Sequence, residues 1–140
     1  MSIRVEDHIE IERLMYLYAR CADHKDYDGF AGVFCDDAVF EYRGHEVSPL
    51  DAICELMHNL EKYPVTQHRV QNVLYDVDED RAVGETYCLA SHLLASGDGA
   101  EKVDMAIVYA DELRRTGDGW RIARRAFNLL WTQTSRIDDA

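Results

Sequence analysis

The sequence predicts an α+β fold, in which helices from the first half of the chain pack on an antiparallel sheet formed by the second half. Apolar residues recur every three to four positions in the helical segments before residue 62, and every second position from residue 65 onward. Turn residues separate the later segments at regular intervals. Because helices and strands are segregated along the chain, the pattern favours α+β over an alternating α/β arrangement.

The first helix is expected over Val5 to His24. Acidic residues crowd its first turns, where they suit the helix dipole, and polar residues interrupt the pattern from Asp23 to Asp26. Its apolar positions have the spacing of one helical face: Ile11, Leu14, Met15 and Tyr18. An amphipathic helix that buries this face is therefore predicted.

Two further helices and a strand are expected before residue 65. A short second helix spans about Tyr27 to Phe34, and Ala38 to Tyr42 is typical of a strand. Ser48-Pro49 then predicts a helix start, with Ser48 as the N-cap and Pro49 at the first helical position. This third helix is expected to run to about Lys62.

Four long strands complete the chain and predict an antiparallel meander. They are expected at these positions: Val65 to Val77, Ala82 to Ala95, Glu101 to Arg115 and Trp120 to about Thr134. A strongly curved antiparallel sheet with three N-terminal helices packed on one side would form a cone-shaped barrel, whose mouth is a natural ligand pocket. Residues 1–140 are the length of one ordinary domain.

Composition and charge exclude several classes of protein. The chain has 15 basic and 27 acidic side chains, a net charge of −12, which argues against partners such as nucleic acid or an anionic membrane. An anionic substrate would need local basic residues to offset this field. The four cysteines lack the paired spacing of a zinc site, so no metal is expected. The absence of a signal-peptide pattern and of a long apolar span favours a cytoplasmic protein.

Asp23 and His68 are the candidate catalytic residues. A histidine on a strand that meets a carboxylate at a helix end would make a general-base pair, because the carboxylate fixes the tautomer and raises the basicity of the other ring nitrogen. Each residue also has a structural interpretation. Asp23 could end its helix by binding a backbone amide, and His68 could be a core histidine.

Four stretches resemble the SnoaL-like group of the nuclear transport factor 2-like superfamily, whose members include dehydratases, a dehydrochlorinase and isomerases. The stretches that carry the resemblance are Tyr18 to Asp23, Thr66 to Asn72, Tyr109 to Arg115 and Gly119 to Arg125. The resemblance covers nearly the whole chain and implies the cone-shaped fold. It does not specify one reaction.

The resemblance implies roles for particular residues. Asp23 and His68 fall where the dehydratases and the dehydrochlorinase keep their acid–histidine dyad, and Tyr18 matches a tyrosine of the bile-acid dehydratase pattern. His92 and Tyr42 fall near pocket residues of scytalone dehydratase, and Arg125 where the dehydrochlorinase has a pocket arginine. Phe40 and Asn72, which shares the alternation of His68, complete the expected substrate-binding set. The tyrosine that precedes the aspartate in scytalone dehydratase is Ala22 here.

We therefore expect a lyase of the dehydratase type or an isomerase, without a cofactor, acting on a small apolar cyclic or polycyclic substrate. A non-catalytic ligand-binding or dimerisation module is the alternative, as is a scaffold like the small subunit of ring-hydroxylating oxygenases. His92 and Arg125 could equally serve packing and a dimer face. A homodimer or higher oligomer is expected through an apolar outer sheet face with these residues: Tyr87, Leu89, Met105, Ile107 and Tyr109.

Overall fold

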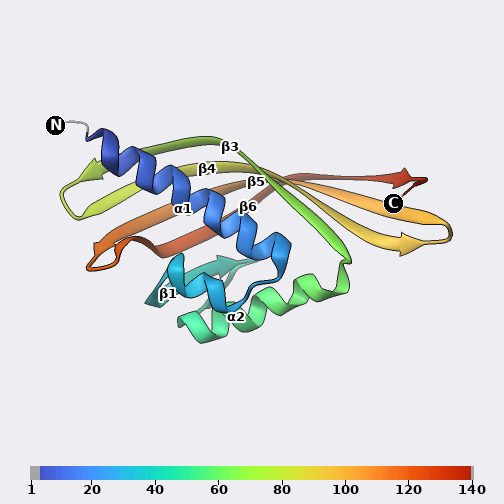
Figure 1. Cartoon of the computed structure of the whole chain (residues 1–140), viewed down its shortest axis with the longest axis horizontal. Helices are drawn as coiled ribbons and strands as arrows, with labels where there is room; N and C mark the ends of the chain where they lie inside the picture. Colours follow the sequence, from blue (N-terminus) through green and yellow to red (C-terminus); the bar gives the residue numbers. More distant parts are fainter. Residues whose placement is uncertain (1–3, 140) are drawn as a thin grey trace.

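The computed structural model describes residues 4–139, which fold as a mixed α+β structure in agreement with the predicted class. Helices cover one face of a sheet (Figure 1). In chain order the elements are α1 (Val5–His24), η1 (Asp28–Gly32), β1 (Phe34–Tyr42), β2 (His45–Val47), α2 (Leu50–Met57), η2 (His58–Lys62), β3 (Val65–Asp78), β4 (Arg81–Ser96), β5 (Gly99–Thr116) and β6 (Gly119–Ile137), where η denotes a 3₁₀ helix.

The strands form one sheet in the order β2-β1-β6-β5-β4-β3. The predicted meander is confirmed, because β3 to β6 pair consecutively and antiparallel. Two features differ from the prediction. β1 joins β6 in parallel register, with Phe40 opposite Arg125, so the sheet is mixed. β2 and β3 are edge strands that do not pair with each other, so the sheet is open and does not close into a barrel.

Only two of the three predicted N-terminal helices are α-helices. The predicted helix at Tyr27 to Phe34 is a 3₁₀ helix of five residues, and β1 already begins at Phe34. A strand can start there because Phe34, Ala38 and Phe40 are buried in the sheet, while Asp36 and Asp37 are exposed.

The third helix also starts differently from the prediction. Pro49, not Ser48, is the N-cap residue of α2, and no side chain caps this end. The Ser48 hydroxyl instead donates a hydrogen bond of 2.8 Å to the Ala38 carbonyl on β1. Ser48 therefore ties the start of α2 to the sheet.

Helix α1 lies across one face of the sheet, the inner face (Figure 1). The apolar stripe of the helix is buried. Ile11, Leu14 and Met15 are at most 3% exposed. Burying an aliphatic side chain of this size stabilises a fold by roughly 1.5–3 kcal/mol. The predicted apolar face of the helix is thus the face that packs on the sheet.

The inner face also contains part of the predicted outer face. Met105, Ile107 and Tyr109 on β5 point toward the helices, whereas Tyr87 and Leu89 on β4 pair with residues of the opposite face. The prediction that all five share an outer face is wrong, because the register places Cys88, not Tyr87, opposite Ile107.

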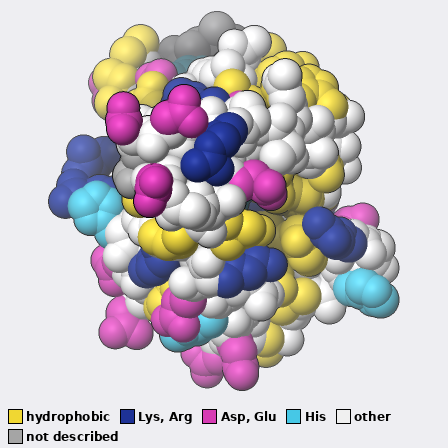
Figure 2. Space-filling model, turned by 90° about the vertical axis from the view of Figure 1, so that its right-hand side faces the viewer, with side chains coloured by type: hydrophobic (Ala, Val, Ile, Leu, Met, Phe, Trp, Pro, Cys, Tyr) yellow, Lys and Arg dark blue, Asp and Glu magenta, His cyan; other side chains and the backbone are white. Residues whose placement is uncertain are grey.

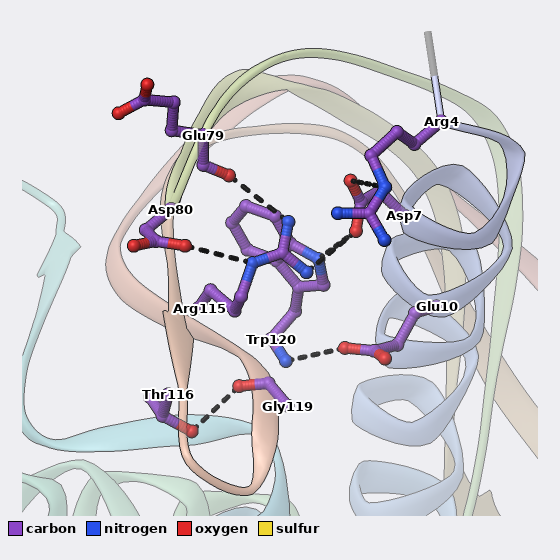
Figure 3. A network of polar contacts seen from close by, with 9 residues as sticks. All are labelled: Arg4, Asp7, Glu10, Glu79, Asp80, Arg115, Thr116, Gly119 and Trp120. Carbon is purple, nitrogen blue, oxygen red and sulfur yellow. Dashed lines mark hydrogen bonds and ion pairs between the residues drawn. The ribbon is translucent and has the colours of Figure 1, made fainter.

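A polar network fixes the N-terminal end of α1 to the β5–β6 turn (Figure 3). Asp7 accepts hydrogen bonds from Arg115 at 2.8 Å and from the Trp120 indole at 3.1 Å. Glu10 accepts one from the Trp120 backbone N–H, and the Arg115 guanidinium stacks over the Trp120 ring at 4.6 Å. These contacts tie the N-terminal end of α1 to β5 and β6. Within residues 4–139, no helix is long and apolar enough to cross a membrane.

Candidate active site

The C-terminal end of α1 positions Asp23. The helix ends at His24, and Lys25 adopts a left-handed conformation with φ 54°. The backbone N–H of Asp26 then donates to the Cys21 carbonyl at 2.9 Å, which satisfies a carbonyl of the last turn. Because the chain turns away after Asp23, its carboxylate is free to reach β3.

Asp23 accepts a set of hydrogen bonds from β3. The His68 ring nitrogen Nδ1 lies 2.7 Å from Oδ1, and the His68 backbone N–H donates to Oδ2 at 2.9 Å. The Thr66 hydroxyl donates to Oδ1 at 3.0 Å. Burial alone would raise the pKa of Asp23, but the hydrogen bonds from His68 and Thr66 outweigh it and hold the pKa below its usual value. The carboxylate is therefore ionised at neutral pH.

An ionised Asp23 determines the tautomer of His68. A carboxylate can only accept, so Nδ1 carries a proton, and the neutral form of the ring has its lone pair on Nε2. The His68 side chain is 6% exposed and lines a cavity, whereas Asp23 lines a shallow groove on the other side of His68. His68 thus separates its carboxylate from the cavity.

The cavity has a volume of about 190 Å³ and lies between the helices and the inner face of the sheet. Its lining is largely aromatic and aliphatic, as in most small-molecule sites. The lining residues are Tyr18, Ala22, Phe40, Tyr42, Arg43, Leu56, Met57, Asn59, Leu60, Lys62, Tyr63, His68, His92, Met105, Ile107, Tyr109 and Phe127. The expected site residues Tyr18, Phe40, Tyr42, His68 and His92 therefore lie together.

His92 is a second imidazole of the cavity wall. It is 5% exposed, and its ring centroid lies 5.7 Å from that of His68 and 4.8 Å from that of Tyr63. Its Nδ1 is buried and makes no hydrogen bond to any described residue. Burial, followed by the proximity of His68, lowers the pKa of His92 to about 4, so the ring is neutral at pH 7.

Arg125 lies beneath the cavity and not on its wall. Its guanidinium stacks on the rings of Tyr18 at 4.3 Å and Tyr109 at 4.1 Å, and it donates to both Asp111 oxygens at 2.7 and 2.8 Å. Burial would lower the pKa of Arg125, but the Asp111 charge outweighs it and raises the pKa, so the guanidinium stays charged. Arg125 therefore contacts the phenol rings that line the cavity, and its guanidinium is paired with the Asp111 carboxylate.

Asn72 does not share the face of His68. A bulge in β3 between Val70 and Val73 shifts the register, so Asn72 is exposed and lies away from the cavity lining. The prediction of a common face failed because strand alternation holds only where pairing is regular.

Several lining residues were not predicted to line the cavity. Met105, Ile107 and Tyr109 carried the correct alternation but were assigned to the wrong face. Arg43 lies in the turn after β1, and Lys62 ends η2. No periodicity predicts where the side chains of turn and helix-end residues point, so nothing in the sequence pattern indicated Arg43 or Lys62.

The fold is that of an α+β protein with a cavity between its helices and its sheet, and comparison identifies the family. Residues 4–126 match the family model of the SnoaL-like domain, and the chain belongs to that family. An uncharacterised protein of Mycobacterium tuberculosis is 30% identical over 127 residues, which are 86% of this chain and 84% of the relative.

Solved structures share the fold at low sequence identity. A candidate scytalone dehydratase from Novosphingobium aromaticivorans superposes with a TM-score of 0.84 at 21% identity, covering 97% of this chain and 92% of that one. A hexachlorocyclohexane dehydrochlorinase from Novosphingobium barchaimii superposes with a TM-score of 0.82 at 18% identity, covering 94% and 92%. At these identities the likeness concerns the fold.

Proposed function

We propose that the protein is a lyase of the dehydratase type, requiring no cofactor, in which His68 is the general base and Asp23 its orienting partner. One observation carries the proposal: Nδ1 of His68 is held by a carboxylate at 2.7 Å while the same ring lines an apolar cavity. The structural neighbours that bear the names of a dehydratase and a dehydrochlorinase support an elimination reaction. We further propose that the curved sheet and its helices act as a cone whose mouth admits the substrate.

In the proposed reaction, Nε2 of His68 removes a proton from a carbon next to an electron-withdrawing group. The electron pair of the broken C–H bond forms a carbon–carbon double bond as the bond to the leaving group breaks. A leaving hydroxide takes a proton and departs as water. The positive charge gained by the imidazole is balanced by Asp23, which is why the carboxylate is needed next to Nδ1.

Tyr18 is proposed to donate a hydrogen bond or a proton to the leaving group. Burial raises the pKa of Tyr18, so its hydroxyl remains protonated at neutral pH. His92 is neutral and lines the cavity, which suits its ring to contact the substrate. Phe40 and Tyr42 supply apolar wall for a ring. If the leaving group is absent, returning the proton to another carbon would give an isomerase.

The proposal is tested by elimination assays on cyclic β-hydroxy ketones and chlorinated cyclohexanes, monitored by product absorbance and NMR. His68→Gln is expected to lower turnover by about 10²–10⁴-fold, the usual value of a general base. His8→Gln, a histidine on α1 that does not line the cavity, is the matched control and should retain activity. Equal turnover of His68→Gln and the wild type on an active substrate would refute the assignment.

A non-catalytic ligand-binding module is the second candidate, and the cavity itself favours it. A binder would hold ring compounds in the same cavity without converting them. The scaffold alternative predicts a partner subunit and needs neither a cavity nor a free imidazole nitrogen. Ligand binding without turnover across the whole panel would support the binder and contradict the lyase.

We also propose that the protein forms a homo-oligomer. The far end of β6 exposes three consecutive large apolar residues: Leu129 at 41%, Leu130 at 59% and Trp131 at 50%. Tyr87 on the outer face of β4 is 38% exposed. Consecutive apolar residues exposed to water are typical of an interface. Light scattering at micromolar concentration should give a mass above that of one chain, and a monomer would refute the proposal.

A further inference from the structure

The charge of the cavity is opposite to that of the whole chain. The chain carries 27 acidic and 15 basic side chains. None of the acids lies among the cavity-lining residues that the structure describes, whereas Arg43 and Lys62 both do. The acids therefore lie away from the cavity lining, and two of them, Asp7 and Asp111, are buried in ion pairs with Arg115 and Arg125. Figure 2 shows basic side chains beside apolar ones near the centre of one face of the molecule.

Neither cation is paired with a carboxylate of residues 4–139. Arg43 lies over the Tyr42 ring at 5.3 Å, and Lys62 lies over the Tyr63 ring at 5.2 Å. Both tyrosines also line the cavity. The aromatic faces hold the two cations at the edge of an apolar space without neutralising them.

The acids nearest in sequence are already engaged. Glu41 and Glu46, on either side of Arg43, both bind Arg124, at 2.9 and 3.2 Å. Glu61, next to Lys62, lies 3.3 Å from His58. The two cations of the cavity are thus left to attract an external anion.

We propose that the substrate is an amphipathic anion, with an apolar ring body inside the cavity and a carboxylate at the mouth between Arg43 and Lys62. This inference rests on the proposed function and names the substrate class of the same site. A cavity of about 190 Å³ exceeds the ~150 Å³ that accommodates benzene, so it accommodates one or two rings. Local cations are required because a chain of net charge −12 repels anions at long range.

The test uses two ring probes of nearly equal shape, 2-naphthoate and the uncharged 2-naphthamide, titrated by calorimetry at pH 7. The wild type is expected to bind the carboxylate about fivefold to tenfold more tightly than the amide, the range for two partly exposed charge contacts. The preference should shrink as salt is raised, because the screening length falls from about 10 Å at 0.1 M to about 3 Å at 1 M.

The double variant Arg43→Gln/Lys62→Gln should lose the preference for the carboxylate while it still binds the amide. The matched control is Arg13→Gln/Arg81→Gln, which removes two exposed cations that lie outside the cavity lining and changes net charge equally. This control should keep the preference. Equal affinity of the wild type for both probes, a preference that survives in the first double variant, or no binding of either probe at millimolar concentration would overturn the proposal.

The outcome is separable from that of the proposed function. His68→Gln leaves the mouth intact, so it should retain the preference for the carboxylate even though turnover is lost. If the protein prefers 2-naphthoate through Arg43 and Lys62 but shows no elimination activity, this inference stands and the proposed lyase function is refuted. If elimination activity is confined to neutral substrates, the lyase function stands and this inference is refuted.

Discussion

Replacing Asp111 by asparagine is expected to cost about 3–5 kcal/mol of unfolding free energy, because it strands the charge of Arg125 in the interior. The side chains are 1% and 0% exposed and share two hydrogen bonds. Breaking one partner of a buried ion pair typically has this cost. For a domain whose total stability is of order 5–15 kcal/mol, the loss would lower the melting temperature by roughly 10 °C or more.

A surface pair of the same chemistry provides the control. Arg114 and Asp37 lie 3.2 Å apart, but their side chains are 49% and 71% exposed. Asp37→Asn is expected to cost less than about 1 kcal/mol. Urea denaturation of the two variants, followed by circular dichroism, measures both losses. If Asp111→Asn is no more destabilised than Asp37→Asn, the reasoning about the buried pair is wrong.

A double replacement separates stranded charge from lost packing. Arg125→Met/Asp111→Leu removes both charges and keeps apolar volume, so it should be more stable than Asp111→Asn alone. Some loss should remain, because the Tyr75 hydroxyl donates to Asp111 at 2.6 Å and would keep only Thr86 and the Met15 sulfur as partners. A double variant that is less stable than the single one would show that the guanidinium matters chiefly through its stacking on the tyrosines.

Two further predictions concern pH. His92 has a pKa of about 4 in the folded state and about 6.5 in the unfolded state, so between these values only the unfolded state takes up the proton. The free energy of unfolding should therefore fall by up to about 3 kcal/mol as pH drops from 6.5 to 4. Urea titrations at pH 7 and 4.5 should show this loss in the wild type and not in His92→Gln. An equal loss in the wild type and the variant would contradict the prediction. The hydrogen bond from Arg115 lowers the pKa of Asp7 in the folded state. The stabilisation that the ionised Asp7 provides is therefore complete above about pH 3.8 and is lost as pH falls through the folded-state pKa. Asp7→Asn should therefore be destabilised at pH 7, by about 2 kcal/mol, with a gap to the wild type that narrows below pH 3.8 in thermal melts.

The sequence predicts the contact between α1 and β3 only in part. The helical spacing placed Asp23 at the end of α1, and the alternation from Val65 placed His68 on a strand. Their meeting across 45 positions depends on how α1 lies on the sheet, to which its buried apolar face and the Asp7 and Trp120 network at its other end both contribute. Local pattern contains no information on that angle, so only the resemblance to a family indicated the contact.

Bulges account for where Asn72 and Arg125 lie. Met105, Ile107 and Tyr109, in contrast, were assigned to the wrong face in the regular pairing of β4 with β5. The register between β5 and β6 shifts between Glu112 and Leu113, and this shift places Arg125 opposite Asp111. A second shift at Ala106 and Ile107 turns Trp131 away from the face of Phe127. An extra residue in one strand leaves the apolar–polar alternation of the other unchanged, so a sequence read strand by strand cannot locate it. The roles of Arg125 and Asn72 were therefore beyond prediction.

The net charge of the chain does not indicate the charge of the cavity wall. The two-residue period of β1 directs Phe40 and Tyr42 into the cavity, while Glu41 between them points outward and binds Arg124. Composition averages over both faces, so a total of −12 describes the outer surface and conceals a cavity wall without acids. Because burying an unpaired carboxylate is costly, acids accumulate on the outer face of a strand whose inner face borders an apolar space. An acidic protein of this architecture can thus present a cationic mouth to its ligand, and the affinity of that mouth for an anion is set by Arg43 and Lys62 and not by the sum of the charges.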